Sequence, residues 1–491
     1  MKEFKKAKAF KKAAAFKKVG AVFLLIILLS GMSACEGRNV ETTTSETEAQ
    51  TGTYPENGLG KEGNVILELA MFDSGIGLEW IQHAIDTFEA KFPNVTINMT
   101  ASPTIDTLVQ TKISAGDTGD MFDIFSAVRL TWEEYADAGK LEEMGELFDR
   151  APYDTPGTAL NKLFPEYSYK YQRFNRMGKV YGLDFCIDVM GLFYEKSFFT
   201  ENGWNEDPRN YAEFTALCDS IKAKGVYPMT FYSGYQYGLI RPKMFELADE
   251  AGMLDQFEYD FRHYMGKQYT NEFSLEMWAK VYEMGKKGYF NPGSGSISHM
   301  VSQMQIIQHS SAMVASGSWI QRQMMSSVPD GFEWGYMAMP FAEKAGSKLY
   351  VQQAAEDSLL IWADKPDINK AWAKEFILWL MNLDVQEKMV DSGLLPIRED
   401  FGKDPERVDK LQGVCKIIID KISDERVVTV DIGSRAAVLN DPNGYGDIAW
   451  GMLNDIRVYV ALGKKDPEAT LIKCEDYFQK ALSDGYQHID Y

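Results

Sequence analysis

The sequence lacks the residue patterns that mark most hydrolases, nucleotide-binding proteins and metalloproteins. Its 491 residues include only five histidines, all scattered, and five cysteines, no two of which are spaced as C-x-x-C. It contains no phosphate-binding P-loop, no G-x-S-x-G and no H-E-x-x-H. Acyl transfer by a catalytic triad and metal-dependent hydrolysis are therefore unsupported. We expect no catalytic residues, no cofactor and no metal ion.

Cysteine is also too sparse to define a disulfide framework. Apart from Cys35, the chain has four cysteines, at positions 186, 218, 415 and 474. Four thiols are enough for two disulfides in an exported protein, but a chain of this length has a large core and does not need them. We therefore predict buried free thiols at these four positions.

Positive charge is scarce outside the first 34 residues. The chain has 51 Lys and Arg against 71 Asp and Glu, a formal net charge of −20. Residues 1–34 hold eight lysines and one glutamate, so the chain without them carries −27. This charge would repel nucleic acid and a bare anionic membrane, and we expect neither as a partner. Two carboxylates of a glycoside hydrolase would leave no spacing signature among so many acids, so that alternative stays open.

Residues 1–35 have the organisation of an export signal. A lysine-rich stretch precedes the apolar run at residues 19–29, which is too short for a membrane-spanning helix of about 20 residues. The ending Met32-Ser33-Ala34-Cys35 resembles a bacterial lipobox, in which the cysteine is acylated and becomes the mature N-terminus. We predict a signal peptide at residues 1–34 and lipidation at Cys35. The alternative is an ordinary signal peptide in which Cys35 is incidental.

The segment that follows, residues 36–64, has almost no aliphatic side chains and is rich in Thr, Ser, Glu and Gly. Such a composition predicts a flexible tether, with a reach on the order of 30 Å if it behaves as a coil. Beyond the signal peptide about 457 residues remain, too many for one core. We therefore expect two domains or lobes.

Hydrophobic periodicity predicts an α/β protein. Residues 65–72 and 95–100 have the pattern of strands and flank a helix expected at residues 78–92, a βαβ unit that predicts a parallel sheet. The apolar run at residues 181–195 predicts a long strand that leaves one lobe and enters the next, with a helix starting at Lys196. Other strands are expected at residues 122–126 and 312–319. Further helices are expected at residues 108–114, 211–224, 243–251, 274–287, 300–310, 368–389, 450–462 and 471–482.

Aromatic residues are abundant: 28 Phe, 25 Tyr and 10 Trp. Several stand where strands are expected to end, notably Phe72, Trp319 and Trp450. A sugar ring has an apolar face and a polar rim, so it is bound by aromatic rings together with Asp, Gln and Arg side chains. Most of these aromatics must nevertheless belong to the core.

Several ordered stretches resemble one known family, the extracellular solute-binding proteins of ABC importers in the maltose-binding-protein-like group. The resemblance covers nearly all of the chain from about residue 65. It is carried by FEAKFPNVTI (88–97), AGDTGDMFDIF (115–125), YADAGKLEEM (135–144), VYGLDFCIDVMGLFYEKSFF (180–199), SAMVASGSW (311–319) and KAWAKEFILWLMNLDVQEKMVDSGLLP (370–396).

The resemblance implies a two-lobed, periplasmic-binding-protein-like α/β fold of type II, with ligand in the cleft between the lobes. It implies a first lobe at residues 65–187 plus about 357–430 and a second at residues 188–356 plus about 431–491, after the lipidated cysteine and linker at residues 35–64. Strand crossovers are expected near residues 186–190, 353–358 and 427–433.

The resemblance also implies ligand-binding residues. Trp319 matches a cleft tryptophan that stacks on sugar, Trp450 matches a second stacking aromatic, and Asp188 falls where the family places a polar group that accepts sugar hydroxyls. The chain lacks the aromatic and acid of maltose-binding members in the loop after the strand at residues 122–126, which argues against maltose itself. Asp123 is expected to be structural. The remaining expected contacts are Phe72, Asp73, Ser126, Arg129, Tyr350 and Gln353.

The predicted function is that of a monomeric, lipid-anchored receptor that captures a carbohydrate, expected to be an oligosaccharide, and presents it to the transmembrane subunits of an ABC permease. The expected location is outside the cytoplasm, on the cell membrane through Cys35. One alternative is a sensing or adhesion lipoprotein of the same fold, because fold does not fix function. The other is a glycoside hydrolase.

Overall fold

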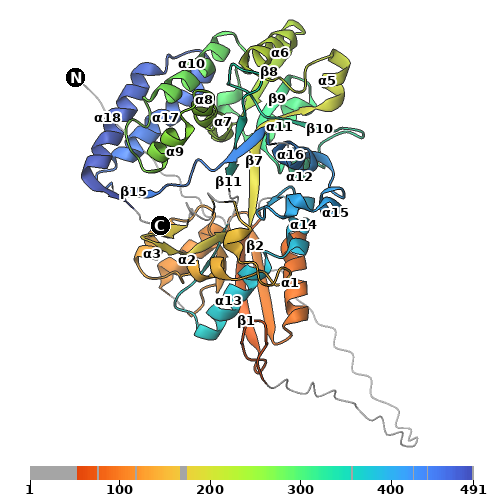
Figure 1. Cartoon of the computed structure of the whole chain (residues 1–491), viewed down its shortest axis with the longest axis vertical. Coiled ribbons are helices and arrows are strands. Elements are labelled where there is room, and N and C mark those ends of the chain that lie inside the picture. The colour runs from red at the N-terminus through yellow and green to blue at the C-terminus, as the bar shows by residue number, and fades with distance from the viewer. Residues whose placement is uncertain are drawn as a thin grey trace, which may run out of the picture. The chain divides into compact units, whose positions relative to one another are not determined.

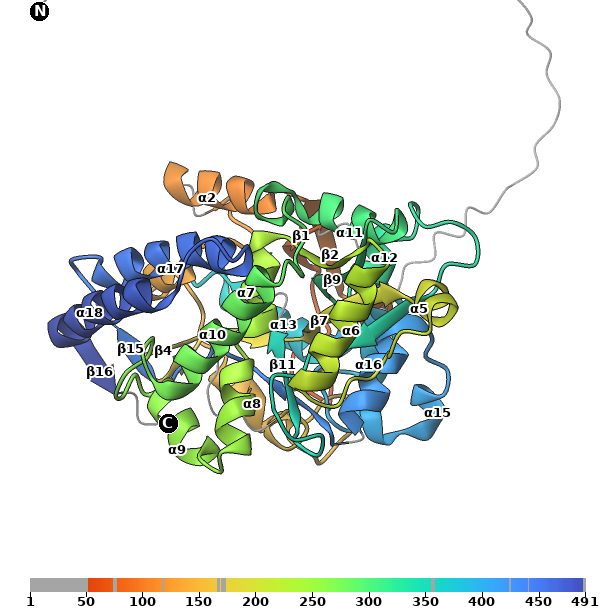
Figure 2. The ribbon, with the colours of Figure 1, turned by 90° about the horizontal axis from the view of Figure 1, so that it is seen from above.

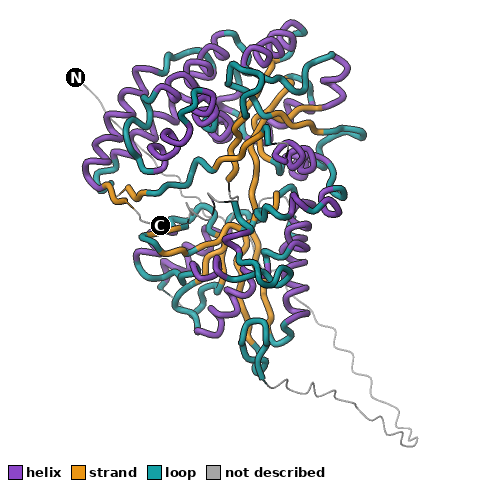
Figure 3. The backbone as a smooth tube through the Cα atoms, in the orientation of Figure 1, coloured by secondary structure: helices purple, strands orange, loops and turns teal. Residues whose placement is uncertain are grey.

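Two β-sheets organise the chain, and helices cover both of them (Figures 1 and 3). The computed structural model describes residues 52–73, 77–116, 119–165, 168, 174–354, 358–423, 425–439 and 441–488. The predicted signal peptide and Cys35 lie outside these residues. Within them, no helix is both long enough and apolar enough to cross a bilayer.

The first sheet has five strands in the order β2, β1, β3, β12, β6. The predicted βαβ unit is present, since β1 lies parallel to β2 with Val65 opposite Val95 and Phe72 opposite Ser102, and β1 is also parallel to β3. β12 is antiparallel to both β3 and β6. The strands are β1 (Val65–Phe72), β2 (Val95–Ser102), β3 (Ile124–Ser126), β6 (Gly182–Asp184) and β12 (Ser358–Ile361).

The elements around this sheet form what we call the first lobe. α1 buries Trp80, Ile81, Ile85 and Phe88 at helical spacing, and it packs against α14. The helices are α1 (Glu79–Lys91), α2 (Ile105–Ala115), α3 (Trp132–Asp137), α13 (Asp367–Trp379) and α14 (Leu383–Asp391), with 3-10 turns η1 (Gly145–Asp149) and η2 (Leu160–Lys162) and a short hairpin, β4 (Asn175–Arg176) and β5 (Lys179–Val180).

One extended segment passes from the first sheet to the second, as predicted. β6 belongs to the first sheet, and β7 (Cys186–Glu195), which starts only two residues after β6 ends, is the central strand of the second. Every residue of β7 is buried, because the strand has neighbours on both edges and covered faces. This explains why its sequence is continuously apolar rather than alternating.

The second sheet has seven strands, and the elements around it form what we call the second lobe. Its main path is β14, β11, β7, β9, β8, and β10 and β13 also pair with β7. β8 is parallel to β9, with Phe231 opposite Ala315. The strands are β8 (Tyr227–Phe231), β9 (Ser311–Gly317), β10 (Trp334–Met337), β11 (Leu349–Ala354), β13 (Leu395–Pro396) and β14 (Val427–Val430).

Helices cover the second sheet, and α17 and α18 lie side by side next to α10 (Figure 2). The earlier helices are α5 (Lys196–Asn202), α6 (Tyr211–Ala223), α7 (Ser233–Ile240), α8 (Lys243–Glu250), α9 (Leu254–Arg262), α10 (Glu272–Lys286), α11 (His299–Ile307) and α12 (Ile320–Met324), with η3 (Ser294–Ser296). The later elements are η4 (Phe401–Lys403), α15 (Pro405–Val408), α16 (Gly413–Ser423), β15 (Ala437–Leu439), α17 (Tyr445–Ala461), α18 (Glu468–Gly485) and β16 (Tyr486–His488).

The chain returns from the second sheet to the first between β11 and β12, where the second crossover was expected. The third crossover between the lobes does not lie at residues 427–433, where it was expected. β14 is already paired with β11 in the second sheet, and α16 before it packs against β10 and β14. The chain therefore enters the second lobe before α16, earlier than the limit of about residue 430 assigned to the first lobe. The other predicted lobe limits remain predictions.

Residues 52–64, which were expected to belong to the flexible tether, instead contact the first lobe. Tyr54 is buried in the core of the first lobe, 4.9 Å from the ring of Phe92 and 5.7 Å from that of Trp372. Its hydroxyl donates to Asn94 Oδ1 at 2.8 Å. One buried aromatic side chain thus anchors a segment whose average composition predicts a coil.

The single helix expected at residues 368–389 is two helices, α13 and α14. Asn382 separates them with extended backbone angles, and its side-chain oxygen accepts the backbone N–H of Asp154 at 3.3 Å. Its backbone carbonyl accepts the N–H of Val385, which starts the second helix. A tertiary contact therefore interrupts a continuous helical pattern.

The cysteines at positions 186, 218, 415 and 474 are buried free thiols, as predicted. Burial raises the pKa of Cys415 to about 12 and that of Cys474 to about 11. Both therefore behave as small apolar core residues rather than as reactive thiolates.

Candidate functional site

The first lobe contributes residues at the carboxyl ends of its parallel strands. β1, β2 and β3 end at the same edge of the sheet, and the backbone N–H of Asp73 donates to Ser102 O at 3.2 Å across that edge. The guanidinium carbon of Arg129 lies 4.9 Å from the centre of the Phe72 ring. Parallel strands converge in this way at the ligand-binding edge of many α/β sheets. The structure therefore brings together three expected contacts, Phe72, Asp73 and Arg129.

Two features fix the loop after β3. Arg129 has a φ of 59°, in the left-handed region, and its Nη1 donates to Pro103 O at 3.2 Å. Ser126 is buried at 1% exposure, and its Oγ accepts the backbone N–H of Val128 at 3.3 Å. Ser126 shapes the turn that presents Arg129.

Buried polar side chains gather where the strands cross between the sheets. Asp188 on β7 stands opposite Ala354 on β11, and Gln353 stands opposite Val189. Asp188 and Gln353 are only 2% and 3% exposed. Close by along the chain, Ser358 Oγ donates to Asp184 Oδ1 at 2.6 Å. Burying a polar group costs free energy unless it is hydrogen-bonded. The concentration of such groups at the crossovers therefore makes this region a candidate ligand-binding site.

The second lobe places Trp319 in a group of rings that we call the aromatic cluster, formed by Tyr232, Tyr235, His299 and Trp319. Ring centres are 5.2 Å apart for Tyr232 and Tyr235, 5.5 Å for Tyr235 and Trp319, and 6.0 Å for Tyr232 and His299. Burial lowers the pKa of His299, which keeps its ring neutral at physiological pH. The cluster combines flat apolar faces with hydroxyl and imidazole groups.

Tyr232, Tyr235 and His299 were not predicted from the sequence. The residues around 200–290 read mainly as helical, so strand β8 was not predicted. Because β8 is parallel to β9, Tyr232 directly after β8 and Trp319 shortly after β9 end at the same edge. The rule that pointed to Trp319 would have found Tyr232 if β8 had been recognised.

Gln236 on α7 places a buried amide next to Tyr235 of the aromatic cluster. It is fully buried, and neither its Nε2 nor its Oε1 has a hydrogen-bond partner within the described residues. α7 packs against β7, β9 and β11, so this amide lies near the crossover strands. A buried amide left without partners is costly, and a ligand hydroxyl is one group that satisfies it.

Tyr350 is placed apart from this group. It is 4% exposed and packs in the core of the second lobe. Its backbone N–H donates to Glu246 Oε2 at 3.1 Å, and burial together with Asp249 raises the pKa of its phenol. These contacts connect β11 to α8.

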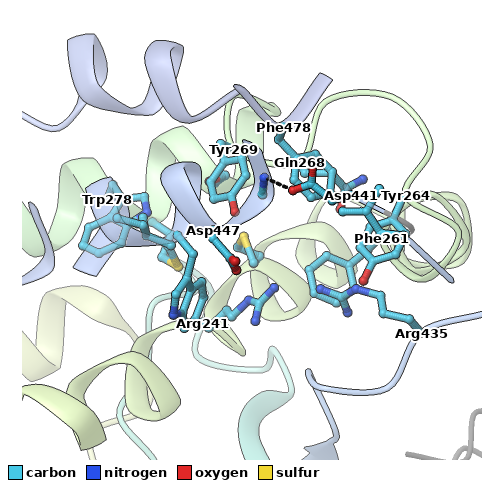
Figure 4. A pocket seen from close by; sticks show the side chains of 17 residues that line it. Arg241, Phe261, Tyr264, Gln268, Tyr269, Trp278, Arg435, Asp441, Asp447 and Phe478 are labelled. Atoms are coloured by element: carbon cyan, nitrogen blue, oxygen red, sulfur yellow. Dashed lines mark hydrogen bonds between the residues drawn. The ribbon is translucent and has the colours of Figure 1, made fainter. Parts of the chain in front are cut away.

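Trp450 is also separate, since it lines a cavity of about 420 Å³ among α8, α9, α10, α17 and α18 (Figure 4). Trp450 is 40% exposed, whereas Trp319 is 7% exposed. The two tryptophans expected to stack on ligand thus lie in different surroundings, one in the aromatic cluster and one in this pocket.

Asp188 and Gln353 give the strand crossovers a buried carboxylate and a buried amide. In the parts of the chain that the structure describes, no group of three or more His, Cys, Asp or Glu side chains is arranged to hold a metal ion.

Comparison with known proteins identifies the class. The model of the bacterial extracellular solute-binding proteins matches residues 83–412, and the chain belongs to this family. The family consists of binding proteins rather than enzymes, and its extracellular place agrees with the prediction. The α/β fold with two sheets, of the periplasmic-binding-protein type, is confirmed.

Individual relatives are distant. The diacetylchitobiose-binding protein NgcE of Streptomyces coelicolor is 24% identical over 362 residues, covering 70% of this chain and 72% of that protein. The multiple sugar-binding protein of Streptococcus mutans is 23% identical over 320 residues, covering 65% and 71%. Among solved structures, a chitin oligosaccharide binding protein superposes with a TM-score of 0.61 at 18% identity, covering 86% of this chain and 99% of that one.

Proposed function

We propose that this protein is the substrate-binding component of an ABC importer and that it captures an oligosaccharide between its two lobes. The observation that carries the proposal is the strand register that links the aromatic cluster to a buried carboxylate. Met190, two residues after Asp188 on β7, pairs with Gly317, two residues before Trp319. A sugar ring stacks on the aromatic faces while its hydroxyls pair with Gln236, Asp188 and Gln353. The names of the curated relatives, which are sugar-binding proteins, support the same ligand class.

Capture requires both lobes. Phe72, Asp73 and Arg129 belong to the first lobe, whereas Trp319 and Tyr235 belong to the second. Only an arrangement in which the two groups approach the same ligand uses all of these contacts, so ligand shifts the lobes toward that closed form. The closed form is the one presented to the transmembrane permease.

A glycan panel in a thermal-shift assay tests the ligand class. A ligand that binds only the native state stabilises it by about 2.7 kcal/mol at a hundredfold excess over Kd. We expect one or more neutral oligosaccharides to raise the melting temperature. Peptides or polyamines that raise it while no glycan does would disprove the carbohydrate ligand.

A substitution in the aromatic cluster tests the site. Trp319 is buried, so Trp319→Phe is preferred to Trp319→Ala in order to keep the fold. We expect sugar affinity to fall about tenfold in Trp319→Phe, equivalent to about 1.4 kcal/mol. Trp379→Phe is the matched control, because Trp379 lies on α13 in the first lobe, where it donates to Thr87. Equal affinity in wild type and Trp319→Phe would remove Trp319 from the site.

The membrane attachment belongs to the same proposal. A binder with a charge of −27 beyond residue 34 is not held at an anionic membrane by its own charge, so delivery to a permease calls for a lipid at Cys35. Fractionation of cells expressing Cys35→Ala tests this. Loss of the protein to the medium or periplasm supports the anchor, and an unchanged membrane fraction contradicts it.

Transport and sensing remain separable by experiment. Uptake of labelled oligosaccharide in cells that lack this protein is expected to fall if it serves an importer. Normal uptake with a lost transcriptional response would instead favour a sensor of the same fold.

A further inference from the structure

The indole of Trp319 lies against the strand that leads to it. Trp319 stands two residues after Gly317, the last residue of β9, and it is only 7% exposed. A methyl group added to Gly317 would come closer than 3.0 Å to three carbons of the six-membered ring of this indole, Cε3, Cζ3 and Cη2. Atoms in a packed interior do not approach one another so closely. The ring therefore occupies the space in which a side chain at position 317 would stand.

The backbone of Gly317 does not itself require glycine. Its φ lies outside the left-handed region in which other residues are strained. The residue is buried and pairs with Met190 on β7 as an ordinary member of the sheet. The three atoms nearest to an added methyl group all belong to Trp319. It is thus this ring, and not the strand conformation, that excludes a side chain.

The main chain at Trp319 has little room to move away. Gly393, in the turn after α14, lies against it with a φ of 84°. A methyl group on Gly393 would lie 3.0 Å from Trp319 Cα and 3.3 Å from Ser318 O. The backbone N–H of Gly393 donates to Val390 O at 2.9 Å, which fixes this turn to the end of α14.

Helix α12, which begins directly after Trp319, is also held in place. Gln321 Oε1 accepts the backbone N–H of Val414 on α16 at 2.8 Å. Gln303, a fully buried residue of α11, donates from Nε2 to Gln323 Oε1 at 2.9 Å. Because the helix is bonded to two neighbours, a side chain at position 317 would turn the indole about its own side-chain torsions rather than shift the main chain.

A turned indole would change the shape of the aromatic cluster. In the structure the ring centres of Tyr235 and Trp319 are 5.5 Å apart, and the ring planes are inclined by 66°. A binding group that must first be reoriented binds its ligand less tightly than one already in place. The missing side chain at position 317 is therefore a condition for the present arrangement of the cluster.

We propose that Gly317 is a positioning residue of the sugar site: because it has no side chain, the indole of Trp319 rests on β9 in the orientation that stacks on a sugar ring. This rests on the proposed function, in which Trp319 contacts the ligand. Gly317 acts on affinity through the Trp319 ring and not through a contact of its own with the sugar.

Calorimetric titration of four proteins tests this proposal: wild type, Gly317→Ala, Trp319→Leu and the variant that carries both changes. Leucine keeps apolar bulk at position 319 but has none of the three ring carbons that an added methyl group would overlap. The titrants are chitin oligosaccharides, malto-oligosaccharides and any other neutral oligosaccharide that raises the melting temperature in the panel. The melting temperature of each protein without sugar is measured alongside.

Gly335→Ala is the matched control. Gly335 lies on β10 in the same sheet, and its φ is also outside the left-handed region. A methyl group added to it would overlap the ring of Tyr194, again at less than 3.0 Å. Tyr194 does not belong to the aromatic cluster. This variant therefore introduces overlap of the same kind, between a methyl group and an aromatic ring, without changing Trp319.

We expect Gly317→Ala to lower sugar affinity about tenfold, whereas Gly335→Ala binds sugar like wild type although both substitutions lower the melting temperature. In the Trp319→Leu background the alanine at position 317 should cause no further loss of affinity, since the ring that it displaces is absent. Its effect on the melting temperature should shrink in that background for the same reason.

Three results overturn the proposal and leave the proposed function standing, because wild type still binds sugar in each. They are unchanged affinity in Gly317→Ala, an equal loss in Gly335→Ala, and an undiminished effect of the alanine on affinity in the Trp319→Leu background. If Gly317→Ala does not fold, the double variant decides: folding of that variant supports the proposal, and failure to fold overturns it. A wild-type protein that binds no oligosaccharide overturns both the proposal and the proposed function.

Discussion

His299 is the aromatic-cluster residue whose charge is most sensitive to its surroundings. Its ring lies 6.0 Å from Tyr232 and 6.1 Å from Tyr235, and burial lowers its pKa from the ordinary 6.5. Protonation would place a charge on a ring that is partly removed from water. Burial therefore favours the neutral imidazole in the aromatic cluster.

We predict that His299 makes stability depend on pH. Its folded-state pKa is lowered, so as the pH falls through about 6.5 the unfolded chain binds the proton first and the native state loses stability. The free energy of unfolding of wild type should decrease between pH 7 and about pH 5, and His299→Gln should flatten that part of the curve. Urea denaturation across this range measures the effect. His83→Gln, on α1, is the control, and identical slopes in wild type and His299→Gln would contradict the prediction.

Asp123 has a structural role in the first lobe. It was expected to be structural, and each of its carboxylate oxygens holds a neighbour at 2.9 Å: Oδ2 accepts the backbone N–H of Glu68, and Oδ1 accepts Asn369 Nδ2. Asp123 is 2% exposed. The residue thus ties the middle of β1 to α13 and to the start of β3.

At the scale of elements, α8 is attached to the second sheet by a buried ion pair. Lys243 and Glu246 lie one turn apart, 2.9 Å between Nζ and Oε2, and are at most 1% exposed. Glu246 accepts the backbone N–H groups of Phe341, Ala342 and Tyr350, and Lys243 donates to Tyr350 O. Burial lowers the pKa of Lys243, so the pair depends on Glu246 to keep the lysine charged.

We predict that Glu246→Gln lowers the free energy of unfolding by about 3–5 kcal/mol, because it leaves Lys243 buried without a counter-charge. Thermal or urea unfolding measures the loss. Glu283→Gln is the matched control: its pair with Lys287 is exposed at 2.9 Å, and we expect less than about 1 kcal/mol. A loss of similar size in both variants would show that the buried pair is not what attaches the helix.

The elements also show where sequence reasoning succeeds and where it stops. The strand at residues 65–72 was predicted to the residue, and the helix at residues 78–92 to within one residue at each end, because their apolar periods are complete and their ends are marked by polar or proline residues. β8 was missed because its five residues lie between helical segments and are too few to show a period. Asn382 and Tyr54 depend on contacts with residues far away in sequence, which no local pattern records.

The candidate site, too, was predicted only in part from the sequence. The family resemblance implied Phe72, Asp73 and Arg129 as contacts, and they lie together because parallel strands place their carboxyl ends at one edge of the sheet. Trp319 and Trp450 were expected from the sequence, whereas Tyr232 in the aromatic cluster needed the parallel pairing of β8 with β9. Pairings between distant segments are set by the whole fold, so single-sequence reasoning reached only part of the site.

At the scale of the whole molecule, an ion pair joins the two lobes. Arg322 on α12 of the second lobe lies 3.0 Å from Glu79 at the start of α1 in the first lobe. Glu79 is exposed, so the pair adds only about 0–1 kcal/mol to the stability of the fold. A contact between lobes acts on their relative position, however, because it exists only in arrangements that keep the two helices close.

We predict that Arg322→Ala leaves the melting temperature nearly unchanged and lets the lobes separate in the absence of ligand. Small-angle X-ray scattering should show a larger radius of gyration for the variant than for wild type, and saturating ligand should remove the difference. Because the pair is exposed, added salt should expand ligand-free wild type toward the variant. Lys388→Ala is the control, since its pair with Asp391 lies within α14 at 3.2 Å and joins no lobes. Equal radii for wild type and Arg322→Ala at low salt would show that this ion pair does not hold the lobes together.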